Sequence, residues 1–150
     1  MMRLPMRFTL VALAVGTVTL GGCGGLLGRG GGSPREYQIT INRQAYNRGN
    51  TGEATIRNAS DKTLEYNLCQ RRLERDVNKY WVVAFEWPTA GGACTSETRT
   101  LTKGTSVNTL FDIPTGVPTG TYRVVFTGLL GEDGRTVSSD RAATPSFAVR

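Results

Sequence analysis

The 150-residue sequence contains no histidine, and it has only three cysteines and three methionines. Without histidine the chain lacks the commonest general base and the commonest zinc ligand, so Ser-His-Asp and Cys-His catalytic arrangements are excluded. No phosphate-binding loop is indicated either, because the glycines within residues 24–32 follow no expected strand and precede no expected helix. We therefore predict that the chain is not an enzyme and that it holds no cofactor and no metal ion.

Acidic residues are fewer than basic ones, 12 against 18, which gives a formal net charge of +6. The basic residues are spread along the chain, and such a spread favours solubility without indicating a nucleic-acid partner. Glu132 and Asp133 stand between two glycines, a pattern typical of a solvated turn and not of acid-base catalysis. Together with Asp140 they are too dispersed to predict a calcium site.

The first 23 residues have the pattern of a bacterial lipoprotein precursor. Two early arginines precede an apolar run over residues 8–20, which is too short to span a bilayer. Residues 20–23, Leu-Gly-Gly-Cys, then read as a lipobox. The sequence thus predicts a signal peptide at 1–22 and a membrane anchor through acyl chains, such as palmitate, on Cys23. The expected location is the extracytoplasmic side of the bacterial cell envelope, at the outer membrane or the periplasmic face in a bacterium with two membranes. The alternative is an ordinary secretory peptide with an incidental cysteine.

Residues 23–35 are rich in glycine and cannot bury enough apolar surface to order themselves, so they are expected to form a flexible tether. If Cys23 carries lipid, Cys69 and Cys94 remain. Two cysteines in an exported chain most simply form one disulfide, because the compartment is oxidising. Two buried free thiols are the alternative.

Beyond the tether, short segments of alternating apolar and polar residues are separated by turn sequences, which is typical of an antiparallel sheet. The expected strands contain these residues: Tyr37 to Ile41, Ala54 with Ile56, Leu64 to Leu68, Tyr80 to Trp87, Arg99 to Leu101, Val107 to Phe111, Tyr122 to Phe126, and Phe147 with Val149. Seven or eight short strands over residues 36–150 predict an all-β domain, a β-sandwich.

Two segments need separate interpretation. Residues Tyr80 to Trp87 are apolar on both faces and are therefore expected at the centre of a sheet. Residues 70–79 are highly charged; Leu73 and Val77 fit one helical turn, but no second apolar pair extends the stripe. A hairpin that turns near residues 76–78 is preferred to a helix.

A series of short motifs runs through residues 36–150: Asn58-Ala59-Ser60, Leu64, Cys69, Leu73-Glu74, Trp81, Cys94, Leu101, Lys103-Gly104, Ile113-Pro114 and Thr119-Gly120-Thr121-Tyr122-Arg123. This series resembles the immunoglobulin-like domains of bacterial cell-envelope lipoproteins. The resemblance implies an immunoglobulin-like sandwich in which Trp81 is the core tryptophan and Tyr122 bonds back to the backbone as a tyrosine corner. Because Cys94 precedes Tyr122, a bridge to Cys69 differs from the usual inter-sheet disulfide and is expected to pin the loop after Trp87.

What the resemblance implies, together with the missing catalytic groups, is a non-catalytic binding or structural module in the cell envelope. We expect a monomer whose partner is an envelope protein or a glycan. The other function left open is an extracytoplasmic protease or hydrolase inhibitor that presents the loop around Gly91 and Gly92, braced by the disulfide.

Four residues are candidates for partner contact. Arg71, Arg72 and Arg75, together with Lys79, form the one basic cluster, although interleaved acidic residues favour a solvated strand pair as the alternative. Trp87 stands at a strand end before a proline, where an exposed aromatic ring anchors partners well. Burial against the edge of the sandwich is the alternative for Trp87.

Overall fold

The structure is a computed structural model that describes residues 35–87 and 97–150. The predicted signal peptide, Cys23, nearly all of the predicted tether and Cys94 lie outside these described residues. The described secondary structure consists of strands, bridges, turns and bends, with no helix among them. The all-β prediction is confirmed for this part of the chain. The described residues accordingly contain no helix that could cross a membrane.

Ten strands occur in the described residues: β1 (Tyr37–Ile41), β2 (Ala45–Tyr46), β3 (Thr51–Asn58), β4 (Leu64–Tyr66), β5 (Arg71–Val77), β6 (Tyr80–Glu86), β7 (Arg99–Leu101), β8 (Ser106–Asp112), β9 (Gly120–Phe126) and β10 (Phe147–Val149). This number exceeds the seven or eight expected. The two-residue strand β2 is too short to produce any period-two pattern, so the sequence did not predict it.

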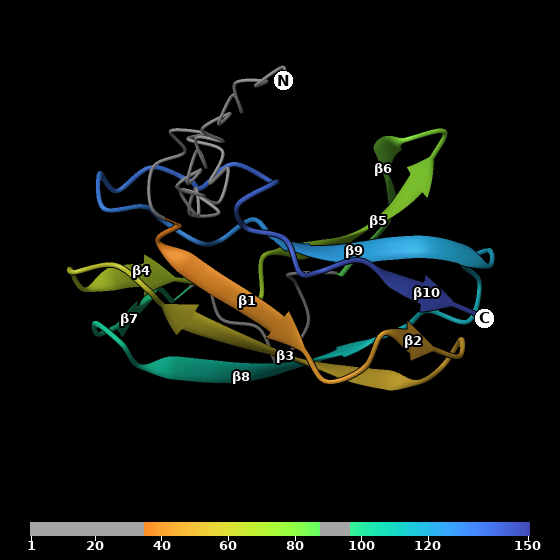
Figure 1. Cartoon of the computed structure of the whole chain (residues 1–150), viewed down its shortest axis with the longest axis horizontal. Helices are drawn as coiled ribbons and strands as arrows, with labels where there is room; N and C mark the ends of the chain where they lie inside the picture. Colours follow the sequence, from red (N-terminus) through yellow and green to blue (C-terminus); the bar gives the residue numbers. More distant parts are fainter. Residues whose placement is uncertain (1–34, 88–96) are drawn as a thin grey trace, which may run out of the picture. The chain divides into compact units, whose positions relative to one another are not determined.

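The strands form three sheets with the orders β1-β3-β8, β2-β10-β9-β5-β6 and β4-β7. All strand pairings are antiparallel except that of β2 with β10, which is parallel. Figure 1 shows the two larger sheets as layers, with β3 and β8 in one and β9 and β10 in the other. Several paired strands, such as β3 with β8, β5 with β9 and β2 with β10, are far apart in the sequence, so each of these two sheets joins distant segments.

Aromatic rings join the two layers in the core. Phe111 of β8 lies 5.6 Å from the ring of Tyr46 in β2 and 5.8 Å from that of Phe147 in β10. Both partners belong to the five-stranded sheet, whereas Phe111 belongs to the three-stranded one. The largest fully buried apolar side chains come from all three sheets and from segments between strands: Tyr122, Phe111, Phe126, Ile56, Leu64, Leu73, Ile113, Leu129, Val124 and Val125. One continuous apolar core therefore holds the layers together.

The charged segment at residues 70–79, which was predicted to be part of a hairpin, does form one. Strands β5 and β6 are joined by Asn78 and Lys79, both with positive φ, 54° and 70°. Two central residues in this conformation make the type I′ turn that matches strand twist. A side-chain oxygen of Asp76 accepts a hydrogen bond from the backbone N–H of Lys79 at 2.8 Å, which supports the turn. The helical alternative is excluded for this segment.

The prediction that Tyr80 to Trp87 forms a central strand is wrong. Strand β6 is the last strand in the order of its sheet, and most of its residues are exposed or half-buried. Its apolar side chains point to both faces of the hairpin, and among the described residues none of them is fully buried, as the central position would require. Figure 1 shows the outer part of the β5–β6 hairpin bending away from β9.

The structural roles that the resemblance implied for Tyr122 and Trp81 compare differently with the structure. Tyr122 is fully buried, and its hydroxyl donates a hydrogen bond to the carbonyl of Pro118 at 2.6 Å, four residues upstream, as expected. Trp81 is only partly buried and is not a member of the core cluster. It does not take the core position because its strand, β6, is at the sheet edge.

Candidate functional site

Exposed apolar side chains gather on the β5–β6 hairpin. Of the large hydrophobic residues that are exposed in the described chain, four belong to this hairpin: Val77 (40% exposed), Tyr80 (75%), Val82 (50%) and Val83 (45%). We call these four residues the β6 edge surface. Contiguous exposed apolar surface on a soluble domain is a common mark of an interaction site.

Both faces of the hairpin contribute to the β6 edge surface. On one face Tyr80 is opposite Val77, and Val82 is opposite Arg75. Val83 is on the other face, because successive side chains of a strand alternate between faces. The surface therefore wraps around the free edge of the sheet.

A β-bulge changes the course of β6 beyond Val83. Val83 is opposite Glu74 and Phe85 is opposite Leu73, so Ala84 is the extra residue between two consecutive residues of β5. Bulges bend a strand and increase its twist. Phe85 consequently shares a face with the fully buried Leu73 and packs against the core, whereas Tyr80, Val82 and Val83 before the bulge are exposed.

No other described strand pairs with the outer side of the β6 backbone. Among the described residues, β6 pairs with β5 and with no other strand. In an antiparallel pair, about every second residue directs its N–H and C=O away from the neighbour. From Tyr80 to Phe85 the strand has no charged side chain, although charges are a common device by which edge strands avoid pairing. Strand β6 is therefore a template for another strand.

A cluster of buried charge fixes the hairpin to the sheet. The Glu74 side chain is almost fully buried and lies between two arginines, with ion pairs of 2.7 Å to Arg72 and 2.8 Å to Arg123. The guanidinium carbon of Arg123 also lies 4.4 Å from the ring centre of Trp81, a cation-π contact. Trp81 thus connects β6 to β9 through Arg123. The sequence pattern did not predict the role of Glu74 or Arg123, because no local signal joins residues 49 positions apart.

The three arginines predicted as a basic cluster point to different partners. Arg71 donates to the hydroxyl of Thr109 at 3.0 Å, and burial lowers its pKa. Arg72 pairs with Glu74, and Arg75 donates to the carbonyl of Thr119 at 3.0 Å. Alternation along β5 separates Arg72 from the other two, so the described structure has no single basic surface here.

Of the two interpretations given for Trp87, the structure favours burial against the edge of the sandwich over exposure to a partner. It is partly buried, packs against the core and meets the ring of Phe85 edge-on at 5.5 Å. The guanidinium carbon of Arg71 lies 5.2 Å from the ring centre of Trp87. These contacts make Trp87 a packing residue of the described domain.

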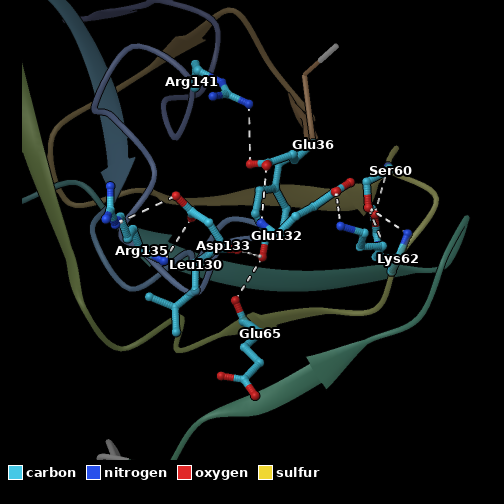
Figure 2. A network of polar contacts seen from close by, with 11 residues as sticks. Glu36, Ser60, Lys62, Glu65, Leu130, Glu132, Asp133, Arg135 and Arg141 are labelled. Carbon is cyan, nitrogen blue, oxygen red and sulfur yellow. Dashed lines mark hydrogen bonds and ion pairs between the residues drawn. The ribbon is translucent and has the colours of Figure 1, made fainter. Parts of the chain in front are cut away.

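Of the three carboxylates considered for acid-base or calcium chemistry, Glu132 and Asp133 are engaged in a surface network (Figure 2), and Asp140 lies outside it. Glu132 pairs with Lys62 at 2.9 Å, and its side chain raises the pKa of that lysine through a hydrogen bond. Asp133 accepts a hydrogen bond from the backbone N–H of Arg135, and Asp140 pairs with Arg123 at 2.9 Å. No group of acidic or cysteine residues in the described part of the chain is arranged to hold a metal ion.

Glu36, at the start of the described domain, connects this network to β1. Its carboxylate accepts a hydrogen bond from the backbone N–H of Glu132 at 3.2 Å and pairs with Arg141 at 3.3 Å. Its backbone carbonyl accepts from the N–H of Ala59 at 2.7 Å. Figure 2 shows Glu36 between Arg141 and the Glu132 segment. The network therefore holds three loops around the first residues of the domain.

The cysteine predictions stay open. Cys69 follows β4, and its backbone N–H donates to the side chain of Asn67 at 2.9 Å. Cys94 and the loop around Gly91 and Gly92 lie outside the described residues, as does Cys23. The predicted disulfide and the inhibitory loop stay predictions.

No family model matches the chain, and no curated protein matches it. Several solved structures are similar to it. The DNA glycosylase AlkC of Pseudomonas fluorescens, solved bound to DNA with an abasic-site analogue, has 13% identity and a TM-score of 0.42, over 81% of this chain and 32% of that one. Spo0M, a sporulation control protein of Bacillus subtilis, has 10% identity and a TM-score of 0.43, over 77% and 49%. The yjhA protein of Bacillus subtilis has 16% identity and a TM-score of 0.39, over 79% and 93%. The chain spans less than half of the first two, and likenesses at this level assign no activity to it.

Proposed function

We propose that this chain is a lipid-anchored, non-catalytic binding module of the bacterial cell envelope, in which an immunoglobulin-like sandwich presents β6 to a partner strand. The observation that carries the proposal is the uncovered edge of β6, where Tyr80 is 75% and Val82 50% exposed. A strand added there gains main-chain hydrogen bonds from the edge and side-chain contacts from the β6 edge surface.

The hairpin is suited to this role because it is held firmly from within. The Glu74–Arg123 ion pair and the Trp81 contact tie β5 and β6 to the sheet. A partner strand would thus meet a preorganised edge and would not have to order it. A protein partner is favoured over a glycan, because a partner strand can use the main-chain groups of the edge as well as the exposed side chains.

The anchor in this proposal is supported by the lipobox at residues 20–23. The eleven residues 24–34 extend to at most roughly 40 Å, so a lipid on Cys23 would keep the domain close to the membrane. The partner is accordingly sought at the same membrane.

Site-specific photo-crosslinking in intact cells tests the proposal. A crosslinking amino acid at position 82 should give a discrete adduct in the membrane fraction, whereas the same amino acid at position 110 should not. Leu110 is a matched control, because it is 61% exposed and lies on β8, the edge of the other large sheet. Adducts of equal yield at both positions, or none at position 82, would refute binding through β6.

The anchor is tested separately by Cys23→Ala. We expect this variant to move from the membrane fraction to the soluble extracytoplasmic fraction while it keeps its thermal unfolding transition. Retention of the variant in the membrane fraction would show that lipid on Cys23 does not hold the protein there.

A further inference from the structure

We propose that the strand that occupies β6 is β6 of a second copy of this chain, paired antiparallel across a two-fold axis near Val83. This inference rests on the proposed use of β6 as the binding edge, and it names the partner. Each copy contributes the same edge, so the arrangement is closed and gives a dimer and not a fibre.

The first argument is the charge pattern of the strand. Lys79 precedes β6 and Glu86 ends it, and both side chains are exposed. Neither forms an ion pair within the described residues. In an antiparallel pair of identical strands, the start of one strand lies beside the end of the other, so Lys79 of each copy comes near Glu86 of the second copy. A parallel pair would instead place like charges together.

The second argument is the neutral centre between these charges. The segment from Trp81 to Phe85 contains only apolar residues. With the axis near Val83, this segment of one copy faces the same segment of the other, and no charged side chain is buried between them. Val83 is then opposite its equivalent, and Val82 is opposite Ala84 of the second copy.

The size of the contact sets the expected strength. Seven residues of strand are roughly 23 Å long. Two such edges bury less than the roughly 1,200–2,000 Å² of a standard stable interface, so the dimer should be weak in solution. Anchoring to one membrane would raise the effective concentration of the copies and favour pairing.

Charge reversal at the strand ends tests the inference on the full chain, purified in detergent with micelles in large excess. Sedimentation equilibrium over a concentration series should show a monomer–dimer equilibrium for the unaltered chain. Lys79→Glu or Glu86→Lys alone should raise the dissociation constant by roughly tenfold, because like charges then meet at both ends of the interface. An equimolar mixture of these two variants should recover the association, since each contact then joins an acidic group of one chain to a basic group of the other.

Leu110→Ser provides a control on the opposite sheet and should leave the dissociation constant unchanged. Circular dichroism melting should show that all variants fold. A chain that stays monomeric at about 1 mM, variants that associate like the parent, or a mixture that fails to recover would each overturn antiparallel self-pairing. If the chain is monomeric but position 82 still crosslinks to a different membrane protein, the binding role of β6 stands and only the identity of its occupant is wrong. If both experiments are negative, both proposals fail.

Discussion

Glu74 and Arg123, which are 49 residues apart in the chain, form a buried ion pair between the adjacent strands β5 and β9. Both the Nε and a terminal nitrogen of Arg123 lie 2.8 Å from the same carboxylate oxygen of Glu74. The other carboxylate oxygen is held by Arg72 at 2.7 Å. One buried carboxylate thus faces two guanidinium groups, while Asp140 compensates the second charge from the surface.

Replacing Glu74 by alanine should be strongly destabilising. Glu74→Ala leaves the nearly buried Arg123 without its main anionic partner, and removal of one member of a buried pair costs about 3–5 kcal/mol. We expect about 3 kcal/mol here, because Arg72 is partly exposed and Arg123 keeps Asp140. Urea unfolding measures the loss. Glu86→Ala, on an exposed residue of β6, is the control and should change stability by less than about 0.5 kcal/mol.

Gly128 is predicted to tolerate no side chain. A Cβ there would lie 2.2 Å from the backbone carbonyl oxygen of Asn67, so Gly128→Ala requires the backbone of one loop to move. We expect a loss of about 3 kcal/mol, at the upper end of the cost of overpacking. Gly116→Ala is a matched control, since a Cβ at Gly116 meets no atom within 4 Å. Equal melting temperatures of the two variants would contradict this prediction.

The hydroxyl of Tyr122 should stabilise the fold measurably. Tyr122→Phe removes the hydrogen bond to Pro118 and leaves its carbonyl oxygen without that donor. The expected loss in the free energy of unfolding is about 1–2 kcal/mol. Tyr80→Phe removes a hydroxyl from a ring that is 75% exposed and should have no measurable effect. A loss of the same size at both positions would show that the hydrogen bond is not the cause.

Stability should decrease at alkaline pH, in part through Tyr37. Burial, together with the nearby carboxylates of Glu36 and Glu65, raises the pKa of Tyr37 well above its ordinary value of 10.0. The folded protein therefore retains the phenol proton at a pH where the unfolded chain has lost it. The resulting stabilisation is complete below about pH 10 and is lost as the pH rises toward the folded-state pKa.

Urea unfolding at about pH 8 and about pH 11 tests this prediction. The parent should lose more stability between these two conditions than Tyr37→Phe does. The variant should still lose some, because burial also raises the pKa values of Tyr46 and Tyr122. If the variant loses as much unfolding free energy between the two pH values as the parent does, Tyr37 does not cause the alkaline loss of stability.

Much of the fold could be predicted from local patterns. Alternation predicted β1 and β9, where Tyr37 and Tyr122 are buried, and the lack of an extended helical stripe predicted the hairpin turn near Asn78. These features depend on neighbours in the sequence. Strand β2 could not be predicted in the same way, because Ala45 and Tyr46 become a strand only by pairing with the end of the chain.

The candidate site was partly hidden from sequence reasoning for a related reason. Apolar residues on both faces of β6 indicate burial in most proteins, but at an edge they indicate a surface that is available to a partner. Strand order distinguishes the two cases, and it depends on β5 lying between β6 and β9. The same topology brings Arg123 to Trp81, which no spacing in the sequence suggests.

Under the proposed membrane anchor, the contacts of Glu36 would have a mechanical consequence. Tension that arrives from the preceding residues enters along β1, whose five residues from Tyr37 to Ile41 each have a partner on β3. A force directed along the strand loads all five residue pairs at once, in shear. A force perpendicular to the strand would instead separate the pairs one after another. The side chain of Glu36, held by Arg141 and by the backbone of Glu132, adds a clamp at the point where the force is applied.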